Sequence, residues 1–351
     1  MKRRAAGRPS GHRLAVLTSC MLTVACADPV TPPAAGPLAD AATVSAGLHI
    51  MDGTLATPAM QSLQALAGLM RAAGSPVASN PAPACGASPA SPAVRDGPSP
   101  AVTALIPDTL RRRVFVYDVV SGAYQETADT SGPVNGIRYM LYSVDTLARV
   151  ITPLASTGWL DLGELGGTPD SIHAQIRSGP SSVADYLVTL TGTQAADTAT
   201  LSGTLTDGAH AFVLHDSTAV VGSTQWIAAT AIDSIDDVQV RMFAARTSFD
   251  PFDYNDTLDF TFVHGADAVR VRGHIQTYCL IPSTGLTVSV DGADFAAVTN
   301  GVTSLNVARL DNVPLTPDQT QAILDLKDAQ QRLFRGLGAM VTPSRSLLPP
   351  N

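Results

Sequence analysis

An acidic segment between residues 250 and 259 holds the side chains best suited to bind an ion. Four carboxylates and one amide fall within it: Asp250, Asp253, Asn255, Asp256 and Asp259. Ca²⁺ takes about six to eight oxygen ligands, which flexible loops rich in Asp and Asn can supply. The spacing is not that of an EF-hand, and the glycine of that loop is missing. The segment is therefore a candidate Ca²⁺ site whose simpler interpretation is a solvated loop between strands, with Asp side chains capping turns.

The histidines do not have the spacing of a metal site. His210 and His215 are five residues apart, which on a strand places them on opposite faces. His264 and His274 lie several pairs apart on the two strands of one predicted hairpin. We expect all four to be solvated or hydrogen-bonded, and the carboxylates at 233, 236 and 237 to belong to a turn.

Catalytic signatures are absent from the sequence. It contains no G-x-S-x-G elbow, H-E-x-x-H motif, P-loop or dinucleotide-binding fingerprint. No nucleophile–base pair can be assembled from neighbouring residues. We therefore expect a protein that is not an enzyme and that needs no cofactor, with Ca²⁺ as the one ion to consider.

The first 25 residues have the layout of a secretory signal. Five basic residues precede an apolar run from Leu14 to Ala25, and Cys26 follows. Leu22–Cys26 resembles a bacterial lipobox, which implies acylation of Cys26 and a membrane-anchored protein of the cell envelope. Cleavage after Ala27 is the main alternative and would release a secreted protein. Cys20 is a poorer lipidation site, because too short an apolar run precedes it. The whole run from Leu14 to Ala25 is also shorter than the about 20 residues that span a bilayer, so we do not expect an uncleaved transmembrane helix.

The charge balance limits the partners. Removing the leader leaves 17 basic against 30 acidic residues. Such a surface repels phosphate backbones, so we expect no nucleic-acid partner. It also offers no polybasic patch for anionic lipids, which leaves the acyl chains of Cys26 as the membrane contact.

Proline separates an N-terminal region from the rest of the chain. Residues 27–110 hold 13 of the 25 prolines, which predicts a disordered tether over 26–110. Within it, Thr57-Pro58 and apolar residues at helical spacing predict a short helix near 58–72. Cys85 and Cys279 could form a disulfide in an exported protein, or Cys279 could be a small buried hydrophobe.

Residues 111–312 alternate between apolar and polar side chains. Runs such as Thr198–Thr206 and Val269–Gln276 have the period of two that is typical of antiparallel strands with one solvated face. Gly-Ala turns follow Asp207, His264 and Asp291, as expected for hairpins. We predict a mainly β fold of about twelve to fourteen strands, arranged as an antiparallel meander in a sandwich, a barrel or a curved sheet.

A helix is predicted over 313–340, followed by a tail over 341–351. Thr316, Pro317 and Gln319 form a capping-box pattern. Ile323, Leu326, Leu333 and Leu337 fall on one stripe that should cover the sheet, and Gly336 and Gly338 are available to end the helix.

Three short runs carry a family resemblance. Asn135–Tyr139, Tyr142–Asp145 and Gly158–Leu162 resemble a stretch found in exported β-rich bacterial lipoproteins that have no assigned activity. The resemblance covers roughly residues 113–165. It implies the compartment and the architecture, and it carries no catalytic or binding residue.

Three classes of function follow. The first is a non-enzymatic envelope lipoprotein with a binding or structural β domain. The second is a periplasmic carrier of lipid or lipoprotein, in which a helix covers the apolar face of the sheet. The third is an envelope hydrolase that uses an Asp pair brought together by the fold. An apolar cavity would favour the carrier, and converging carboxylates with shifted pKa values would favour the hydrolase.

Overall fold

The computed structural model describes residues 41–74, 104–166, 170–193, 196–221, 224–247, 253–278, 281–300 and 305–348. Its helices are α1 (Ala41–Leu55), α2 (Pro58–Gly74) and α3 (Pro317–Arg345). Its strands are β1 (Val114–Asp118), β2 (Ala123–Glu126), β3 (Gly136–Tyr142), β4 (Ser156–Glu164), β5 (Asp170–Ser178), β6 (Ser181–Thr193), β7 (Ala196–Thr206), β8 (Ala211–Val221), β9 (Thr224–Asp233), β10 (Val238–Arg246), β11 (Asp253–His264), β12 (Asp267–Tyr278), β13 (Ile281–Val290), β14 (Ala293–Asn300) and β15 (Leu305–Arg309).

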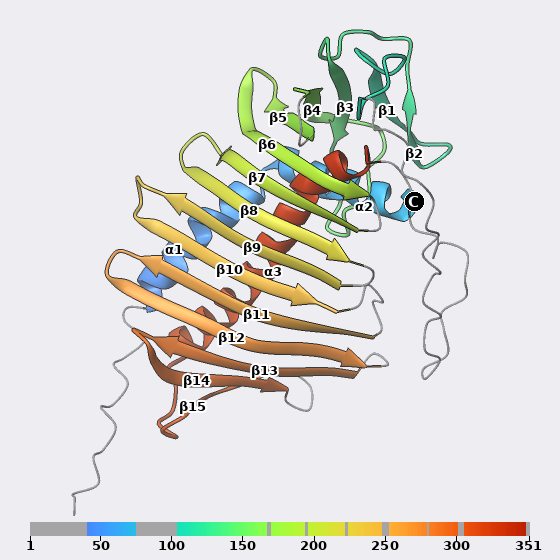
Figure 1. Ribbon diagram of the computed structural model, residues 1–351. Coiled ribbons are helices and arrows are strands. Elements are labelled where there is room, and N and C mark those ends of the chain that lie inside the picture. Colours follow the sequence, from blue (N-terminus) through green and yellow to red (C-terminus); the bar gives the residue numbers. More distant parts are fainter. Residues whose placement is uncertain are drawn as a thin grey trace, which may run out of the picture. The chain divides into compact units, whose positions relative to one another are not determined.

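The fifteen described strands form one sheet in which β3 to β15 follow each other in chain order (Figure 1). Each of these strands is antiparallel to the next, and among the described strands one parallel pair occurs, between β1 and β3. The sheet ends at β15 on one side and at β2 on the other, so it is open. The predicted mainly β meander is confirmed, as an open sheet instead of a sandwich or a closed barrel.

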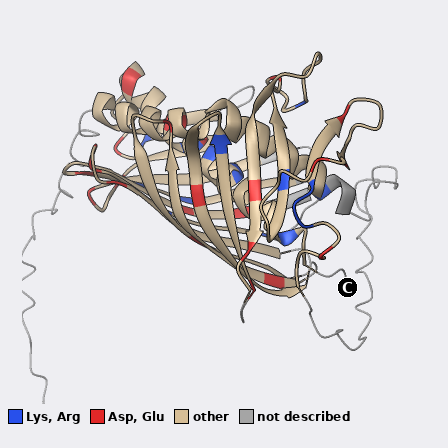
Figure 2. Ribbon diagram, turned by 90° about the horizontal axis from the view of Figure 1, so that it is seen from above, with Lys and Arg blue, Asp and Glu red and all other residues tan. Residues whose placement is uncertain are grey.

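The sheet has one covered and one uncovered face. The inner face carries the buried apolar residues of every long strand and contacts the three helices (Figures 1 and 2). Leu201, Val240, Phe260 and Val271 are examples, and each is almost completely buried. The outer face carries the alternate positions, mainly Thr, Ser and charged residues. The strict alternation along β7 and β8 produces this division, because successive side chains point to opposite faces.

Two helices correct the expected N-terminal tether. Residues 41–74 form α1 and α2, of which only the second was predicted, and both contact α3. Val44, Leu48, Met51 and Leu55 lie buried along α1 at the spacing of one helix face. They belong to the same hydrophobic core as the sheet, so residues 41–74 are part of the folded domain and not of a disordered tether.

The C-terminal helix begins as predicted and ends later. The Thr316 hydroxyl accepts from the Gln319 N–H, and the Gln319 side chain accepts from the Thr316 N–H. The helix then continues through both glycines to Arg345. Gly336 is needed for close packing, since a Cβ there would lie 2.8 Å from Leu55 Cδ2 on α1. No described helix has the length and apolar composition needed to cross a membrane.

The Gly-Ala turns form hairpins as expected. Gly208, Gly265 and Gly292 all have positive φ and connect β7–β8, β11–β12 and β13–β14. In a meander these turns lie at one end of the sheet, together with the β9–β10 turn. The chain thereby brings Asp and His residues from several turns to that end.

Candidate functional site

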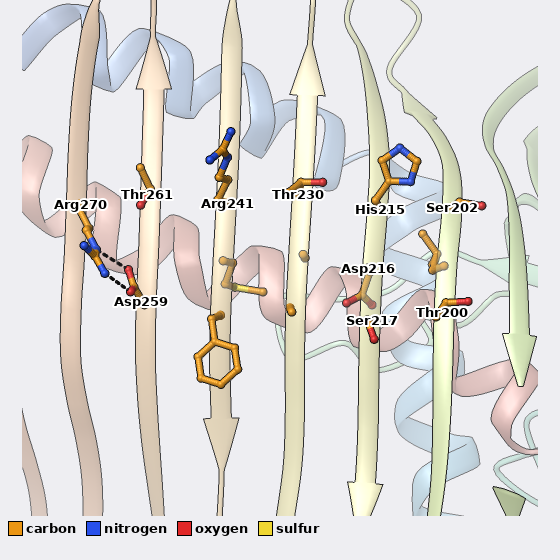
Figure 3. Close-up of a pocket in the computed structure, with 15 residues that line it drawn as sticks. Thr200, Ser202, His215, Asp216, Ser217, Thr230, Arg241, Asp259, Thr261 and Arg270 are labelled. Atoms are coloured by element: carbon orange, nitrogen blue, oxygen red, sulfur yellow. Dashed lines mark hydrogen bonds and ion pairs between the residues drawn. The ribbon is translucent and has the colours of Figure 1, made fainter. Parts of the chain in front are cut away.

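A row of polar side chains crosses the outer face. Strand pairing places Ser202 opposite His215, His215 opposite Thr230, Thr230 opposite Arg241 and Arg241 opposite Thr261. Figure 3 shows these five residues in line across β7 to β11. Neighbouring strands lie about 4.8 Å apart, so the row presents polar groups at regular intervals.

Arg241 is the free cation of this row. Within the part of the chain that the structure describes, the Arg241 side chain has no ion pair or hydrogen bond. Arg270, on β12 beyond Thr261, is instead engaged by Asp259, with Nε 2.7 Å from Oδ1 (Figure 3). The hydrogen bond with Asp259 raises the pKa of Arg270 above the ordinary value of an arginine. Arg241 therefore has its donors available for an external anion or hydroxyl group.

Two aromatic side chains lie on the outer face on one side of the row, with Phe243 nearer to it than Trp226. Trp226 on β9 and Phe243 on β10 are 37% and 45% exposed on the outer face. Trp226 pairs with Ala245, two residues along β10 from Phe243, so the two rings are diagonal neighbours. Exposed rings next to polar groups are typical of surfaces that bind amphipathic ligands.

The row, Phe243 and the Arg270–Asp259 pair line a shallow depression of about 650 Å³. Ser202 and His215 are the nearest approach to a nucleophile and a base. No hydrogen bond between them occurs in the described structure, and their side chains do not converge in Figure 3. The depression thus has donors, acceptors and one apolar ring, that of Phe243, for binding, without an assembled catalytic pair among the described residues.

A second polar cluster lies on the inner face under α3. Arg345 donates to Asp197 at 2.7 Å and to the Thr218 hydroxyl at 2.8 Å. Asp216 is on the same face of β8, two residues before Thr218, and is only 4% exposed. Neither of its carboxylate oxygens has a well-formed hydrogen bond in the described structure. Burial raises the pKa of Asp216 to about 7, against the lowering effects of Arg345 and the Ser217 N–H. Burial also raises the pKa of Asp197. These groups are shielded by α3, which suits a role in packing.

The acidic segment is not the solvated loop that was expected. From Asp253 onward it belongs to β11, so Asp256 and Asp259 extend toward opposite faces. Asp256 is held by Arg246, with Nε 2.7 Å from Oδ1, while Asp259 is held by Arg270. Asn255 lies on the outer-face side, and the Asp253 side chain and Asp250 lie outside the described residues. Two of the five candidate Ca²⁺ ligands therefore point apart and are paired with arginines, so the described residues do not bring the five together.

The remaining candidate residues are the histidines, which are exposed or hydrogen-bonded, and the cysteines, which the structure does not describe. His215 and His274 are exposed, and His264 Nδ1 lies 2.9 Å from the Thr43 carbonyl oxygen. His210 contacts Asp236, a contact that the spacing of the histidines did not indicate. Cys26, Cys85 and Cys279 lie outside the described residues.

The runs that carry the family resemblance form the β3–β4 hairpin. Arg138 binds both oxygens of Asp161, at 2.6 and 2.8 Å, and its guanidinium lies 5.0 Å from the centre of the Trp159 ring. A Cβ at Gly136 would lie 1.9 Å from the Leu162 carbonyl oxygen, so only glycine fits there. The types of Gly136, Arg138, Trp159 and Asp161 are thus explained by the pairing of β3 with β4.

Comparison with protein-family models, with curated proteins and with solved structures finds no match to this chain. The interpretation of the site therefore rests on its geometry.

Proposed function

We propose that this protein is a non-enzymatic lipoprotein of the cell envelope, anchored through acylated Cys26, whose outer sheet face binds an extended glycan with acidic groups. The observation that supports this most is the depression on that face, where unpaired Arg241 lies on the row of hydroxyl groups beside exposed Phe243. Exposed Trp226 lies on the same face outside the depression, diagonal to Phe243. No described helix or strand packs on this face.

The ligand class follows from the three kinds of contact that the depression offers. Arg241 favours a carboxylate or another anion, because its guanidinium can donate two parallel hydrogen bonds. Ser202, Thr230 and Thr261 can exchange hydrogen bonds with hydroxyl groups. The Phe243 ring can cover the apolar face of a sugar, and Trp226, outside the depression, offers a second ring to a longer chain. A linear chain laid across the strands would meet these groups in succession.

The test is affinity electrophoresis of the full chain carrying Cys26→Ala, in gels containing peptidoglycan fragments, lipopolysaccharide O-chains or acidic capsular polysaccharide. Arg241→Ala and Phe243→Ala should each weaken the retardation at least tenfold. Gln276→Ala changes an exposed residue of the same sheet face outside the depression and should bind like the parent chain. The absence of retardation by every glycan, or equal binding by all three variants, would refute the proposal.

The carrier and hydrolase alternatives find less support in the geometry. The inner-face side chains are buried against α1, α2 and α3, so a lipid would have to displace those helices. The two inner-face carboxylates with raised pKa values, Asp197 and Asp216, are each 4% exposed and would be closed to a substrate. Native mass spectrometry of the protein extracted from its envelope tests the carrier directly, because a co-purifying lipid would favour it over glycan binding.

A further inference from the structure

Two neighbouring hairpin turns bring together a histidine and two carboxylates that are unrelated to the outer-face depression. His210 closes the β7–β8 turn, Asp233 ends β9, and Asp236 lies in the β9–β10 turn. One potential ligand atom from each of the three lies within 4.8 Å of the others. The meander creates this cluster, because β8 and β9 are adjacent and both turns lie at the same end of the sheet.

Asp233 is the unusual member. It is 0% exposed, and its Oδ1 accepts from the Ile235 and Asp236 N–H groups at 2.8 and 3.4 Å. Its Oδ2 is buried and has no hydrogen-bond partner in the described part of the chain. A buried carboxylate oxygen without a partner is costly unless a cation or a donor compensates it. The fold thus keeps an acceptor next to His210 that none of the described residues satisfies.

His210 and Asp236 complete an arrangement that a cation could occupy. His210 Nδ1 lies 2.6 Å from Asp236 Oδ2, and both side chains are about 30% exposed to solvent. The imidazole nitrogen and the Asp236 oxygen thus lie next to the buried Asp233 carboxylate, whose Oδ2 has no partner among the described residues, and are open to solvent on one side. A metal ion bound here would be held by the neutral imidazole and the two carboxylates, because metal ligands bind in their deprotonated form.

Asp207 supports the site without being free to ligate. Its Oδ1 accepts from the Ala209 and His210 N–H groups, each at 2.8 Å, and its Oδ2 lies 3.5 Å from the Thr54 hydroxyl of α1. These contacts hold the turn that presents His210. Asp207 adds negative charge near the cluster while remaining engaged in the turn.

We propose that His210, Asp233 and Asp236 bind one divalent transition-metal ion of the Zn²⁺ type, linking the β7–β8 turn to the β9–β10 turn. One imidazole nitrogen and two carboxylate oxygens are a ligand set that Zn²⁺ accepts, with water in the remaining position. The nitrogen ligand argues against Ca²⁺ and Mg²⁺, which prefer oxygen. Zn²⁺ bond lengths of about 2.0–2.2 Å would draw the ligand atoms closer together than they lie now. His210 and Asp236 are on exposed turns that can make this adjustment, while Asp233 is fixed at the end of β9.

Isothermal titration calorimetry of the untagged, chelator-treated full chain with ZnCl₂ tests the proposal. We expect one site per chain that responds to Zn²⁺ and not to Ca²⁺ or Mg²⁺. Asp233→Asn keeps the Oδ1 acceptor of the turn but removes the charge, and it should weaken Zn²⁺ binding at least 100-fold. His210→Gln should have a similar effect. Circular dichroism of each variant checks that the sheet is intact.

His173→Gln is the matched control. His173 also forms a pair with a carboxylate, since its Nε2 lies 2.7 Å from Asp185 Oδ1, and both side chains are about 45% exposed. This pair is not part of the three-residue cluster. The His173→Gln variant should therefore leave Zn²⁺ binding unchanged. No Zn²⁺ binding by the parent chain, or binding that survives both Asp233→Asn and His210→Gln as it does in the control, would overturn the proposal. The second result would assign the zinc to other ligands such as the cysteines.

Discussion

Arg345, the last residue of α3, donates its Nε–H to Asp197 Oδ1 on β7 at 2.7 Å, although 148 positions separate the two residues. The pair is nearly enclosed, with side-chain exposures of 15% and 2%. The same guanidinium reaches Thr218 on β8. The end of the helix is therefore fastened to two strands of the inner face by charged hydrogen bonds.

Replacing Arg345 by methionine should destabilise the fold by about 3–5 kcal/mol, because Asp197 would be left as an uncompensated buried charge. Urea unfolding at pH 8 measures the change. Arg335→Met on the exposed side of the same helix should change stability by less than about 0.5 kcal/mol. Similar losses for the two variants would contradict a specific role for the Arg345–Asp197 pair.

Asp216 should make the stability depend on pH. Its pKa is about 7 in the folded protein and about 3.9 in an unfolded chain. Between these values the folded state holds a proton that the unfolded state has released, so its contribution to stability falls as the pH rises from about 4 to about 7. Asp216→Asn should remove this contribution and should be more stable than the parent chain at pH 8.

Urea unfolding of both chains at pH 5, 6, 7 and 8 provides the comparison. Asp108→Asn changes a carboxylate that is 88% exposed and should leave the pH profile as it is. A constant difference between Asp216→Asn and the parent chain at all four pH values would show that Asp216 does not titrate in this range.

The start and the middle of α3 should differ in their contributions. Thr316→Ala removes the acceptor of the Gln319 N–H and should cost about 1 kcal/mol. Leu326→Ala empties a fully buried position and should cost about 2–5 kcal/mol. Thermal melting of both variants beside the parent chain tests the ranking. An unshifted midpoint for Leu326→Ala would mean that α3 does not pack on the sheet in solution.

Two glycines of the N-terminal helices should respond in opposite ways to alanine. A Cβ at Gly47 would lie 2.7 Å from Phe262 Cζ, and Phe262 is fully buried, so Gly47→Ala should destabilise by about 1–3 kcal/mol. Gly68 has no such neighbour within 4 Å, so Gly68→Ala should stabilise α2 by up to about 1 kcal/mol. Differential scanning fluorimetry suffices for both. If Gly47→Ala were neutral, α1 would not lie against β11.

The proposed anchor has its own test. Mass spectrometry of protein from the membrane fraction should find an acylated N-terminus at Cys26. Cys26→Ala should either be released or remain as the uncleaved precursor. An unmodified N-terminus at Asp28 would contradict acylation and would leave simple secretion as the explanation of the leader.

Much of the fold could be predicted because its signals are local. The alternation along β7 and the capping box at Thr316 each require only a few neighbouring residues, and both are confirmed. The turns at Gly208, Gly265 and Gly292 were likewise predicted from short Gly-Ala sequences. α1 was missed although Val44, Leu48, Met51 and Leu55 have helical spacing, because the prolines around it indicated a tether.

The outer-face row and the His210 cluster depend on which strands pair and in which register, and this could not be predicted from the sequence. Alternation places Arg241 and His215 on the same face, but only the pairing of both with Thr230 places them in one row. Likewise His210 and Asp236 meet because two hairpin turns end side by side. The acidic segment shows the opposite case, since a dense run of Asp is divided between two faces once it becomes a strand.

The order of the elements also determines when the core closes during synthesis. From β4 onward, each strand pairs with the one made just before it, so the sheet can grow as the chain emerges. The helix that covers the inner face of β6 and β7 is made last. Until it arrives, a broad apolar surface faces water, and a chain halted before residue 317 would expose that surface to chaperones, to aggregation or to lipid.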